Sequence, residues 1–239
     1  MRAVLTFHSI DSLPGPLSYP AARLEAMLNG LAEAALPVLT LDQLLADDGA
    51  HGVALTFDDG ISTVFSAAMP ILREHKVPAH VFVITRWVGS DNRWPGQPAS
   101  ATPFKLMNWN QLEAIRDAGF LIEAHTASHP DLRSLDDAGI EDEMEEADAL
   151  IETRLGRRPR YFAYPYGYHD ARVRAVAGTR YHGCFTTRLD YLGLSIKLDA
   201  LPRLDTHYLR SPALVRGLEG KSAQSYIMLR RALRRLRGQ

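Results

Sequence analysis

The chain has 239 residues, of which 46% are hydrophobic and 23% charged, a composition typical of soluble globular proteins rather than disordered or fibrous ones. Its 27 basic and 28 acidic residues leave a formal net charge of −1, which excludes a general electrostatic attraction to nucleic acid. The single cysteine, Cys184, excludes an internal disulfide bond, and no run of about 18 apolar residues predicts a membrane span. The first apolar run is shorter than a signal-peptide core, so if this is the whole natural chain we expect a cytoplasmic protein.

Strand-like and helix-like segments alternate along the chain, which is the pattern of an α/β protein. Runs of apolar, β-branched and aromatic residues predict strands at 3–7, 38–41, 53–57, 79–84, 120–124, 161–164, 183–186 and 200–203. Amphipathic patterns predict helices at 21–35, 61–75, 109–118, 136–155, 170–177 and 212–219. Pro70 is expected to begin a helical turn, and Gly119 to cap a helix in the left-handed conformation. Repeated strand–helix units imply a parallel sheet, and a single α/β barrel of this length is ordinary.

Two segments stand outside this alternation. Residues 85–108, rich in Gly and Pro, form the longest irregular stretch, and their place after a strand predicts that they wall a binding cleft. Residues 226–239 carry five arginines, no acid, and apolar residues at helical spacing, which predicts a basic amphipathic helix. We therefore expect a barrel over residues 1–220 and a helical segment over residues 221–239. This helix would dock on the barrel with a solvated basic face, adhere to an anionic membrane surface, or bind an acidic partner.

Two polar clusters stand directly after predicted strands. Asp58 and Asp59 follow residues 53–57, and His125 and His129 follow residues 120–124. One carboxylate and two imidazoles are a common ligand set for a catalytic zinc, and the second carboxylate is left free to take a proton from bound water. Taken alone, each cluster has an ordinary alternative, a tight Asp-Gly turn or a pair of surface histidines. Together they predict metal-assisted hydrolysis at one rim of a barrel.

The same clusters carry a resemblance to a known family. The tract TFDDG at 56–60, the spacing HTASH at 125–129 and the tract FAYPYG at 162–167 resemble the motifs of the polysaccharide deacetylases, the NodB-homology group or carbohydrate esterase family four. The third motif of that family, Arg-x-Pro-Tyr, has Ala163 in place of its arginine. The opening TFHSI at 6–10 resembles the exopolysaccharide-type members, which have an N-terminal histidine motif.

The resemblance implies a distorted (β/α)7 TIM-like barrel in a single domain, and metal-dependent removal of acetyl groups from sugars. It implies that Asp58 is the general base and that the backbone N–H of Tyr166 helps to hold the oxyanion. The implied metal ligands are Asp59, His125 and His129.

Two roles of the family need substitutes in this chain. Arg203, after a late predicted strand, is the candidate to orient the base in place of the missing arginine, with an ordinary surface salt bridge as the alternative. His8 is the candidate general acid that protonates the leaving amine, with a structural histidine at the end of the first strand as the alternative. His207, in a late Asp-Thr-His tract, is the other candidate for the acid.

These observations predict an N-deacetylase acting on an amino sugar in a glycan precursor, nucleotide-linked or lipid-linked. Zinc is the expected metal, although cobalt, nickel and manganese accept the same mixed nitrogen and oxygen ligands. No nucleic-acid partner is expected. Contact of the basic C-terminal helix with the inner face of a membrane is the alternative to its docking on the barrel. The alternatives are a deformylase or other hydrolase of a C–N amide bond on the same fold, and a glycan-binding homologue that has lost its chemistry.

Overall fold

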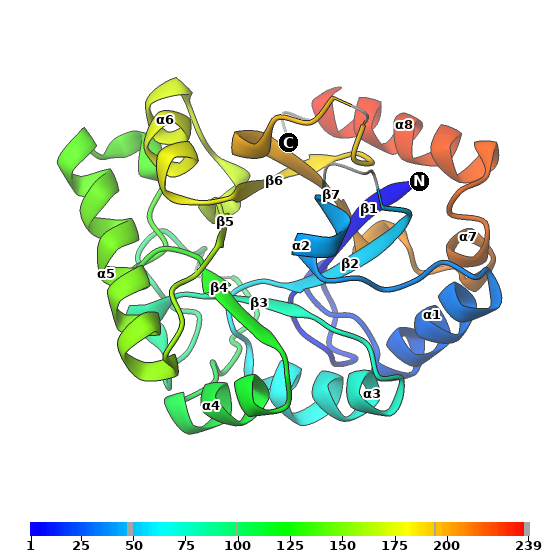
Figure 1. Cartoon of the computed structure of the whole chain (residues 1–239), viewed down its shortest axis with the longest axis horizontal. Coiled ribbons are helices and arrows are strands. Elements are labelled where there is room, and N and C mark those ends of the chain that lie inside the picture. Colours follow the sequence, from blue (N-terminus) through cyan, green and yellow to red (C-terminus); the bar gives the residue numbers. More distant parts are fainter. Residues whose placement is uncertain (47–49, 99, 194, 237–239) are drawn as a thin grey trace.

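Seven parallel strands close into a barrel in the computed structural model, which describes residues 1–46, 50–98, 100–193 and 195–236 (Figure 1). Neighbours in the sequence are neighbours in the barrel, and β7 returns to pair with β1. The α/β barrel predicted from the sequence is therefore confirmed. The strands are β1 (Arg2–Phe7), β2 (Gly52–Phe57), β3 (His80–Val83), β4 (Leu121–Ala124), β5 (Tyr161–Ala163), β6 (Gly183–Leu189) and β7 (Leu201–Asp205).

The barrel is uneven around its circumference. β1 and β2 pair along their whole length, from Arg2 opposite Gly52 to Phe7 opposite Phe57. In contrast, β4 and β5 are paired only at Ala124 and Phe162, and the register between β6 and β7 shifts. The distorted form expected from the resemblance is the form observed.

Helices cover the outside of the barrel (Figure 1). They are α1 (Ala21–Glu33), α3 (Met69–Glu74), α4 (Trp109–Asp117), α5 (Asp137–Leu155), α6 (Ala171–Arg180), α7 (Pro212–Arg216) and α8 (Lys221–Leu236). The short α2 (Leu41–Leu44) instead packs Leu41 and Leu44 against the apolar cluster inside the barrel. Among the described residues between β6 and β7, only the short 3-10 turn η5 (Leu198–Ala200) is helical. The C-terminal helix α8 packs against β6 instead and buries Ala223 and Ile227. None of the helices in the described ranges is long and apolar enough to cross a membrane.

One predicted strand, residues 38–41, is wrong. Val38 forms a single bridge to Val53, and the chain then turns into α2. The reason is a capping box, in which the Thr40 side chain accepts from the Gln43 N–H while the Gln43 side chain accepts from the Thr40 N–H. This local helix start outweighs the β-branched composition that predicted a strand.

The predicted helix over residues 61–75 is divided. A π-helical turn, η1 (Val64–Ala68), precedes α3, and Pro70 lies in the first turn of α3 as expected. Proline has no N–H to donate to the carbonyl four residues earlier, so a wider turn accommodates the chain before it.

The remaining elements agree with the predictions except at their ends. Asp136 caps α5 rather than belonging to it, because its side chain accepts from the Gly139 N–H at 2.8 Å. Gly119 has the predicted left-handed conformation, with φ +90°. The C-terminal helix begins at Lys221, the first residue of the helical segment predicted over residues 221–239, and residues 237–239 of that prediction lie outside the described residues.

The inside of the barrel changes from apolar to polar toward the C-terminal ends of the strands. Alternate residues of a strand share one face, so Ala54, Thr56 and Asp58 lie on the same side of the chain at β2. Ala54 belongs to a buried apolar cluster with Phe82 and Phe185, whereas the hydroxyl oxygens of Thr6 and Thr56 are 3.1 Å apart. Because side chains alternate between the two faces of a strand, the Asp58 carboxylate lies in a buried polar layer inside the barrel.

Candidate active site

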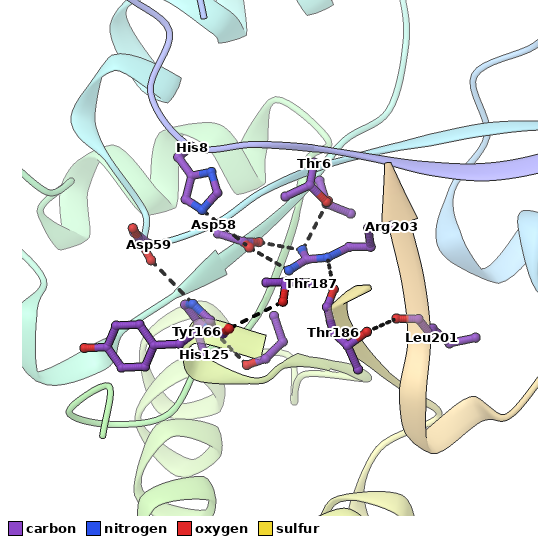
Figure 2. Close-up of polar contacts among 12 residues, drawn as sticks. Thr6, His8, Asp58, Asp59, His125, Tyr166, Thr186, Thr187, Leu201 and Arg203 are labelled. Carbon is purple, nitrogen blue, oxygen red and sulfur yellow. Dashed lines mark hydrogen bonds and ion pairs between the residues drawn. The ribbon is translucent and has the colours of Figure 1, made fainter. Parts of the chain in front are cut away.

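The side chains selected from the sequence meet at the C-terminal rim of the barrel (Figure 2). All seven strands run parallel, so their C-terminal ends share one rim. Residues far apart in the sequence are brought together there, as the parallel arrangement predicts. The rim carries His8 after β1, Asp58 and Asp59 after β2, His125 and His129 after β4, Tyr166 after β5, and Arg203 within β7.

Asp59, His125 and His129 form a compact, buried group with the geometry of a metal site. One ligand atom from each residue lies within 4.8 Å of the others. The Asp59 Oδ1 atom is 3.4 Å from His125 Nε2 and 3.8 Å from His129 Nε2. Two imidazole nitrogens and one carboxylate oxygen are suitable donors for zinc or another divalent metal and leave further positions open.

A hydrogen bond to the backbone orients the His125 ring. Its Nδ1 lies 2.7 Å from the carbonyl oxygen of Ala163, so Nδ1 carries the proton and donates it there. Nε2 is the ring nitrogen that faces Asp59. Ala163 has replaced the arginine of the family motif, yet its backbone still orients a proposed ligand.

The protonation of the other two residues also fits a cation. Burial, with the nearby His125, lowers the pKa of His129 to about 3, so its imidazole is neutral at neutral pH. Burial acts to raise the pKa of Asp59, but the hydrogen bond with His125 and the surrounding histidines more than offset this and hold that pKa below its ordinary range. A neutral imidazole and an ionised carboxylate are the forms that coordinate metals.

The backbone is strained at this site. Asp59, Thr126, His129 and Tyr166 all have positive φ angles, of 67°, 66°, 65° and 58°. Such conformations cost about 1–3 kcal/mol each and persist where the surrounding structure enforces them. For the histidine loop, one such contact is the Thr126 hydroxyl, which accepts from the His129 N–H at 2.9 Å.

Asp58 is held by Arg203 rather than by a neighbour in the sequence. The two terminal nitrogens of Arg203 donate to Asp58 Oδ1 at 2.8 Å and Oδ2 at 2.7 Å, and both side chains are almost fully buried. The Arg203 Nε donates to the carbonyl oxygen of Thr186 at 3.2 Å, which fixes the plane of the guanidinium. Burial acts to raise the pKa of Asp58, but the charge and hydrogen bond of Arg203, together with the nearby His8 and His125, outweigh burial and hold the pKa below its ordinary value. Asp58 is therefore an ionised, oriented carboxylate beside the metal ligands.

The two candidate acids lie in different places. His8 is partly exposed, and its Nε2 is 4.0 Å from Asp58 Oδ2 (Figure 2). His207 is exposed, and its contacts are with Arg210 and Tyr208. The structure thus places His8, and not His207, beside Asp58.

Tyr166, the candidate oxyanion donor, lies beside the candidate metal ligand His129. It belongs to the tight turn η4 (Pro165–Gly167), its ring packs 4.5 Å from the His129 ring, and its N–H donates to no other described residue. The irregular segment 85–108 reaches the same place, because Trp94 Nε1 donates to the Tyr166 hydroxyl at 3.2 Å and the Trp94 ring lies 4.6 Å from that of His129. The segment therefore contacts the candidate site residues, while its role as the wall of a binding cleft stays a prediction.

Glu143 supports the histidine loop and was not predicted from the sequence. From α5, its carboxylate accepts from the Ser128 N–H at 2.8 Å and from the Ser128 hydroxyl at 2.6 Å. Its backbone carbonyl accepts from the Ala127 N–H at 3.0 Å. No local signal distinguishes Glu143 from the other acids on this helix, so only the tertiary structure reveals its contact.

Comparison with known proteins identifies the family. Residues 46–181, more than half of the chain, match the polysaccharide deacetylase family. The chain belongs to this family, the NodB-homology group that its motifs resemble. A chitin deacetylase of Colletotrichum lindemuthianum is 31% identical over 139 residues, which cover 58% of this chain and 51% of that protein. The chain spans less than two thirds of the length of the curated relatives that it matches first.

Solved structures share the fold. The deacetylase PplD of Streptococcus pyogenes has a TM-score of 0.73 at 21% identity, covering 84% of this chain and 90% of that chain. IcaB of Ammonifex degensii has a TM-score of 0.72 at 22% identity, covering 90% of this chain and 97% of that chain. At these identities the similarity extends to the fold alone.

Proposed function

We propose that this chain is a metal-dependent hydrolase that removes N-acetyl groups from an amino sugar of a glycan or glycan precursor. Its family supports glycan deacetylation in general. The observation that carries the specific proposal is the Asp58–Arg203 pair beside Asp59, His125 and His129. A divalent metal at such a ligand set can activate water, and an ionised carboxylate beside it can accept the proton of that water, which together allow hydrolysis of an amide.

Each proposed group has one role. A zinc ion, or cobalt, nickel or manganese, held by Asp59, His125 and His129 would polarise a water molecule and the acetamide carbonyl. Asp58 accepts the proton of the attacking water, and Arg203 keeps this base ionised and in a fixed orientation.

Two further groups act on the acetamide itself. The N–H of Tyr166 donates to the carbonyl oxygen as negative charge develops on it, and one such donor is worth about 2.7–4 kcal/mol in the barrier. His8 then gives a proton to the nitrogen as the C–N bond breaks, so that acetate and a free amine leave the site. The position of His8 beside Asp58 supports this assignment.

The C-terminal helix supports a membrane-bound location for the substrate. Met228 and Leu229 are each 58% exposed and Leu236 is 84% exposed, next to the arginines of α8. Apolar side chains exposed beside cations are typical of helices that lie on an anionic membrane surface. We therefore include peripheral membrane contact through α8, and a lipid-linked amino sugar as the favoured substrate.

The test of this function is acetate release. Zinc-loaded or cobalt-loaded protein, with bound metal confirmed by elemental analysis, is incubated with N-acetylglucosamine oligomers and with lipid-linked N-acetylated sugars. We expect acetate and free amine in equal amounts. Formate in place of acetate would instead indicate a deformylase, and no turnover of any acylated sugar would contradict the proposal.

The substitution Asp58→Asn assigns the base. We expect it to lower kcat by at least about 100-fold, because general-base catalysis typically contributes 10²–10⁴, while the metal content is unchanged. The matched control is Asp117→Asn, an exposed acid paired with its neighbour Arg116, which is expected to retain full activity. An unchanged rate in the Asp58 variant would reject this assignment.

A further inference from the structure

A cavity of about 600 Å³ lies beside the active-site rim, lined by the turn after β5, the end of β6 and the helix α8. Its walls include Gly167, Thr186 and Thr187, but neither Asp58 nor any of the proposed metal ligands. Its volume lies within the range of small-molecule sites, which is about 300–1,000 Å³. It is therefore a separate space next to the proposed site of hydrolysis.

The walls of this cavity are strongly basic. No acid is found among the described residues that line it. Two of its cations form ion pairs with acids that do not line the cavity. Arg174 lies 3.7 Å from Asp199, and Arg231 pairs with Asp190. The other four pair with no carboxylate in the described part of the chain. The cations of the walls are Arg174, Arg188, Lys197, Arg231, Arg234 and Arg235.

Such an arrangement favours an anionic ligand. Like charges gathered around one space repel each other and destabilise the folded protein unless an anion is bound among them. Arginine presents a planar fork of N–H donors that matches two oxygens of a phosphate group. The chain as a whole is nearly neutral, but these cations gather around one cavity. The preference for an anionic ligand is therefore a property of this cavity and not of the whole surface.

Two residues of the cavity wall, Thr186 and Thr187, lie beside Arg203 and Tyr166 of the proposed mechanism (Figure 2). Thr187 on its wall donates its hydroxyl to the Tyr166 carbonyl oxygen at 3.4 Å. Thr186, also on its wall, accepts from the Arg203 Nε. A ligand that occupies the cavity therefore lies next to the residues that hold the base and the oxyanion donor.

We propose that this cavity binds the phosphate or diphosphate group of the substrate, which is an amino sugar linked through a phosphate ester. The inference rests on the proposed function for the place of the acetamide, and it adds a second point of recognition. Neutral oligosaccharides lack the anion that would occupy this cavity, so phosphorylated sugars bind more tightly.

Binding is measured separately from catalysis. The full metal-loaded chain carrying Asp58→Asn is titrated by calorimetry with uridine diphosphate N-acetylglucosamine and with N-acetylglucosamine. We expect at least tenfold tighter binding of the diphosphate sugar. Adding Arg188→Gln and Lys197→Gln is expected to reduce this preference about tenfold, which corresponds to about 1.4 kcal/mol.

The matched control adds Arg73→Gln and Lys76→Gln, which remove two exposed cations near the C-terminal end of α3, away from the cavity. We expect this control to bind the diphosphate sugar as tightly as the Asp58→Asn protein. Equal affinity for both sugars, or an unchanged preference after the cavity substitutions, would overturn the proposal. If binding behaves as expected but acetate is never released by the otherwise unaltered enzyme, the proposed hydrolysis fails while the phosphate site stands.

A membrane headgroup is the other source of phosphate. The same cavity variant is therefore mixed with vesicles of phosphatidylglycerol and of phosphatidylcholine. We expect vesicle binding to change little, because the apolar residues of α8 are intact. Loss of phosphatidylglycerol binding with an unchanged preference for the diphosphate sugar would assign the cavity to lipid headgroups and overturn the substrate assignment.

Discussion

Arg203 is the proposed substitute for the arginine of the family's third motif, which this chain lacks. The motif's arginine is replaced by Ala163, next to Tyr164. The Arg203 guanidinium, from β7, lies inside the barrel and donates a hydrogen bond to each carboxylate oxygen of Asp58. Its Cζ atom lies 5.8 Å from the ring centres of Phe82 and Phe185, so the pair is enclosed by aromatic side chains. The proposed orienting role would thus be filled by a residue at a different position in the sequence.

Replacement of Arg203 is expected to affect stability and activity together. Arg203→Met leaves the Asp58 carboxylate buried without its partner, which typically costs about 3–5 kcal/mol. Arg203→Lys retains the positive charge but cannot donate to both oxygens of Asp58 with a planar guanidinium. We therefore expect a smaller loss of stability, and about a 100-fold lower kcat because the base is misplaced. Urea denaturation and acetate release measure the two effects, with the exposed Arg73→Met as the control. Full activity in Arg203→Met would remove Arg203 from the mechanism.

His8 can be distinguished from His207 by the leaving group. An amine must be protonated as it leaves, whereas the phenolate of an activated aryl acetate needs no proton. We expect His8→Gln to lower kcat about 10²–10⁴-fold on an acetamide and much less on p-nitrophenyl acetate. His207→Gln is expected to behave as the unaltered enzyme on both substrates, because that side chain is exposed and contacts Arg210. The reverse pattern would transfer the acid role to His207.

At the scale of elements, the loops after the strands are positioned by the helices that follow them. Glu143 of α5 ties down Ser128 between the two histidines, and Asp148 of the same helix receives the Tyr181 hydroxyl at 2.9 Å and Arg158 at 3.3 Å. This helix therefore connects the proposed metal site with the packing around α6. Among the many acidic residues of α5, Glu143 and Asp148 are buried and make different contacts.

The Asp148 contact predicts a pH-dependent term in stability. Burial, which outweighs the hydrogen bond from Tyr181 and the nearby arginines, raises the pKa of Asp148 from 3.8 to about 6. The folded protein therefore binds this proton more tightly than the unfolded chain, so the contribution to stability is full below pH 4 and is lost as the pH rises through 6.

The substitution Asp148→Asn tests this sign. We expect the unfolding free energy of the unaltered protein, relative to that of the variant, to fall by about 1–3 kcal/mol between pH 4 and pH 7, from a shift worth 1.36 kcal/mol per pKa unit. Urea denaturation across this pH range provides the measurement. Asp142→Asn, an exposed position on the same helix, should show no such trend. A difference that rises with pH would contradict the assigned pKa shift.

At the scale of the whole molecule, α8 packs against β6, next to a stretch between β6 and β7 whose described residues are helical only at η5 (Figure 1). It buries Ala223 and Ile227 while Met228, Leu229 and Leu236 remain exposed. Docking on the barrel and contact with a membrane are therefore compatible, because they use different residues of one helix.

Membrane contact through α8 predicts selective vesicle binding. We expect the protein to sediment with phosphatidylglycerol vesicles more than with phosphatidylcholine vesicles, and this binding to weaken at high salt. Changing Met228, Leu229 and Leu236 to Ser should reduce binding at least tenfold, since each buried CH₂ group contributes about 0.8 kcal/mol. The control Leu13→Ser removes an exposed apolar residue elsewhere. Equal binding by all variants would exclude α8 as the contact.

Local sequence patterns determined much of this architecture. The alternation of apolar runs and amphipathic segments determines a parallel α/β barrel, because strand and helix periods are local properties. The short motifs around Asp58, Asp59, His125 and His129 likewise predict the metal ligands and the base, because each motif is contiguous in the chain. The pattern fails at residues 38–41, where a capping box overrides strand-forming composition, and before Pro70, where a missing N–H widens the helix.

Only the tertiary structure decided which distant groups join this cluster. The sequence offered Arg203 as a candidate, but its hydrogen bonds to Asp58 and the contact of Glu143 with Ser128 arise from barrel closure. The basic walls of the cavity beside β6 depend in addition on the docking of α8. The same closure placed His8 next to Asp58 and left His207 at the surface. Short-range periodicity fixes which elements form, whereas long-range packing selects the side chains that complete the site.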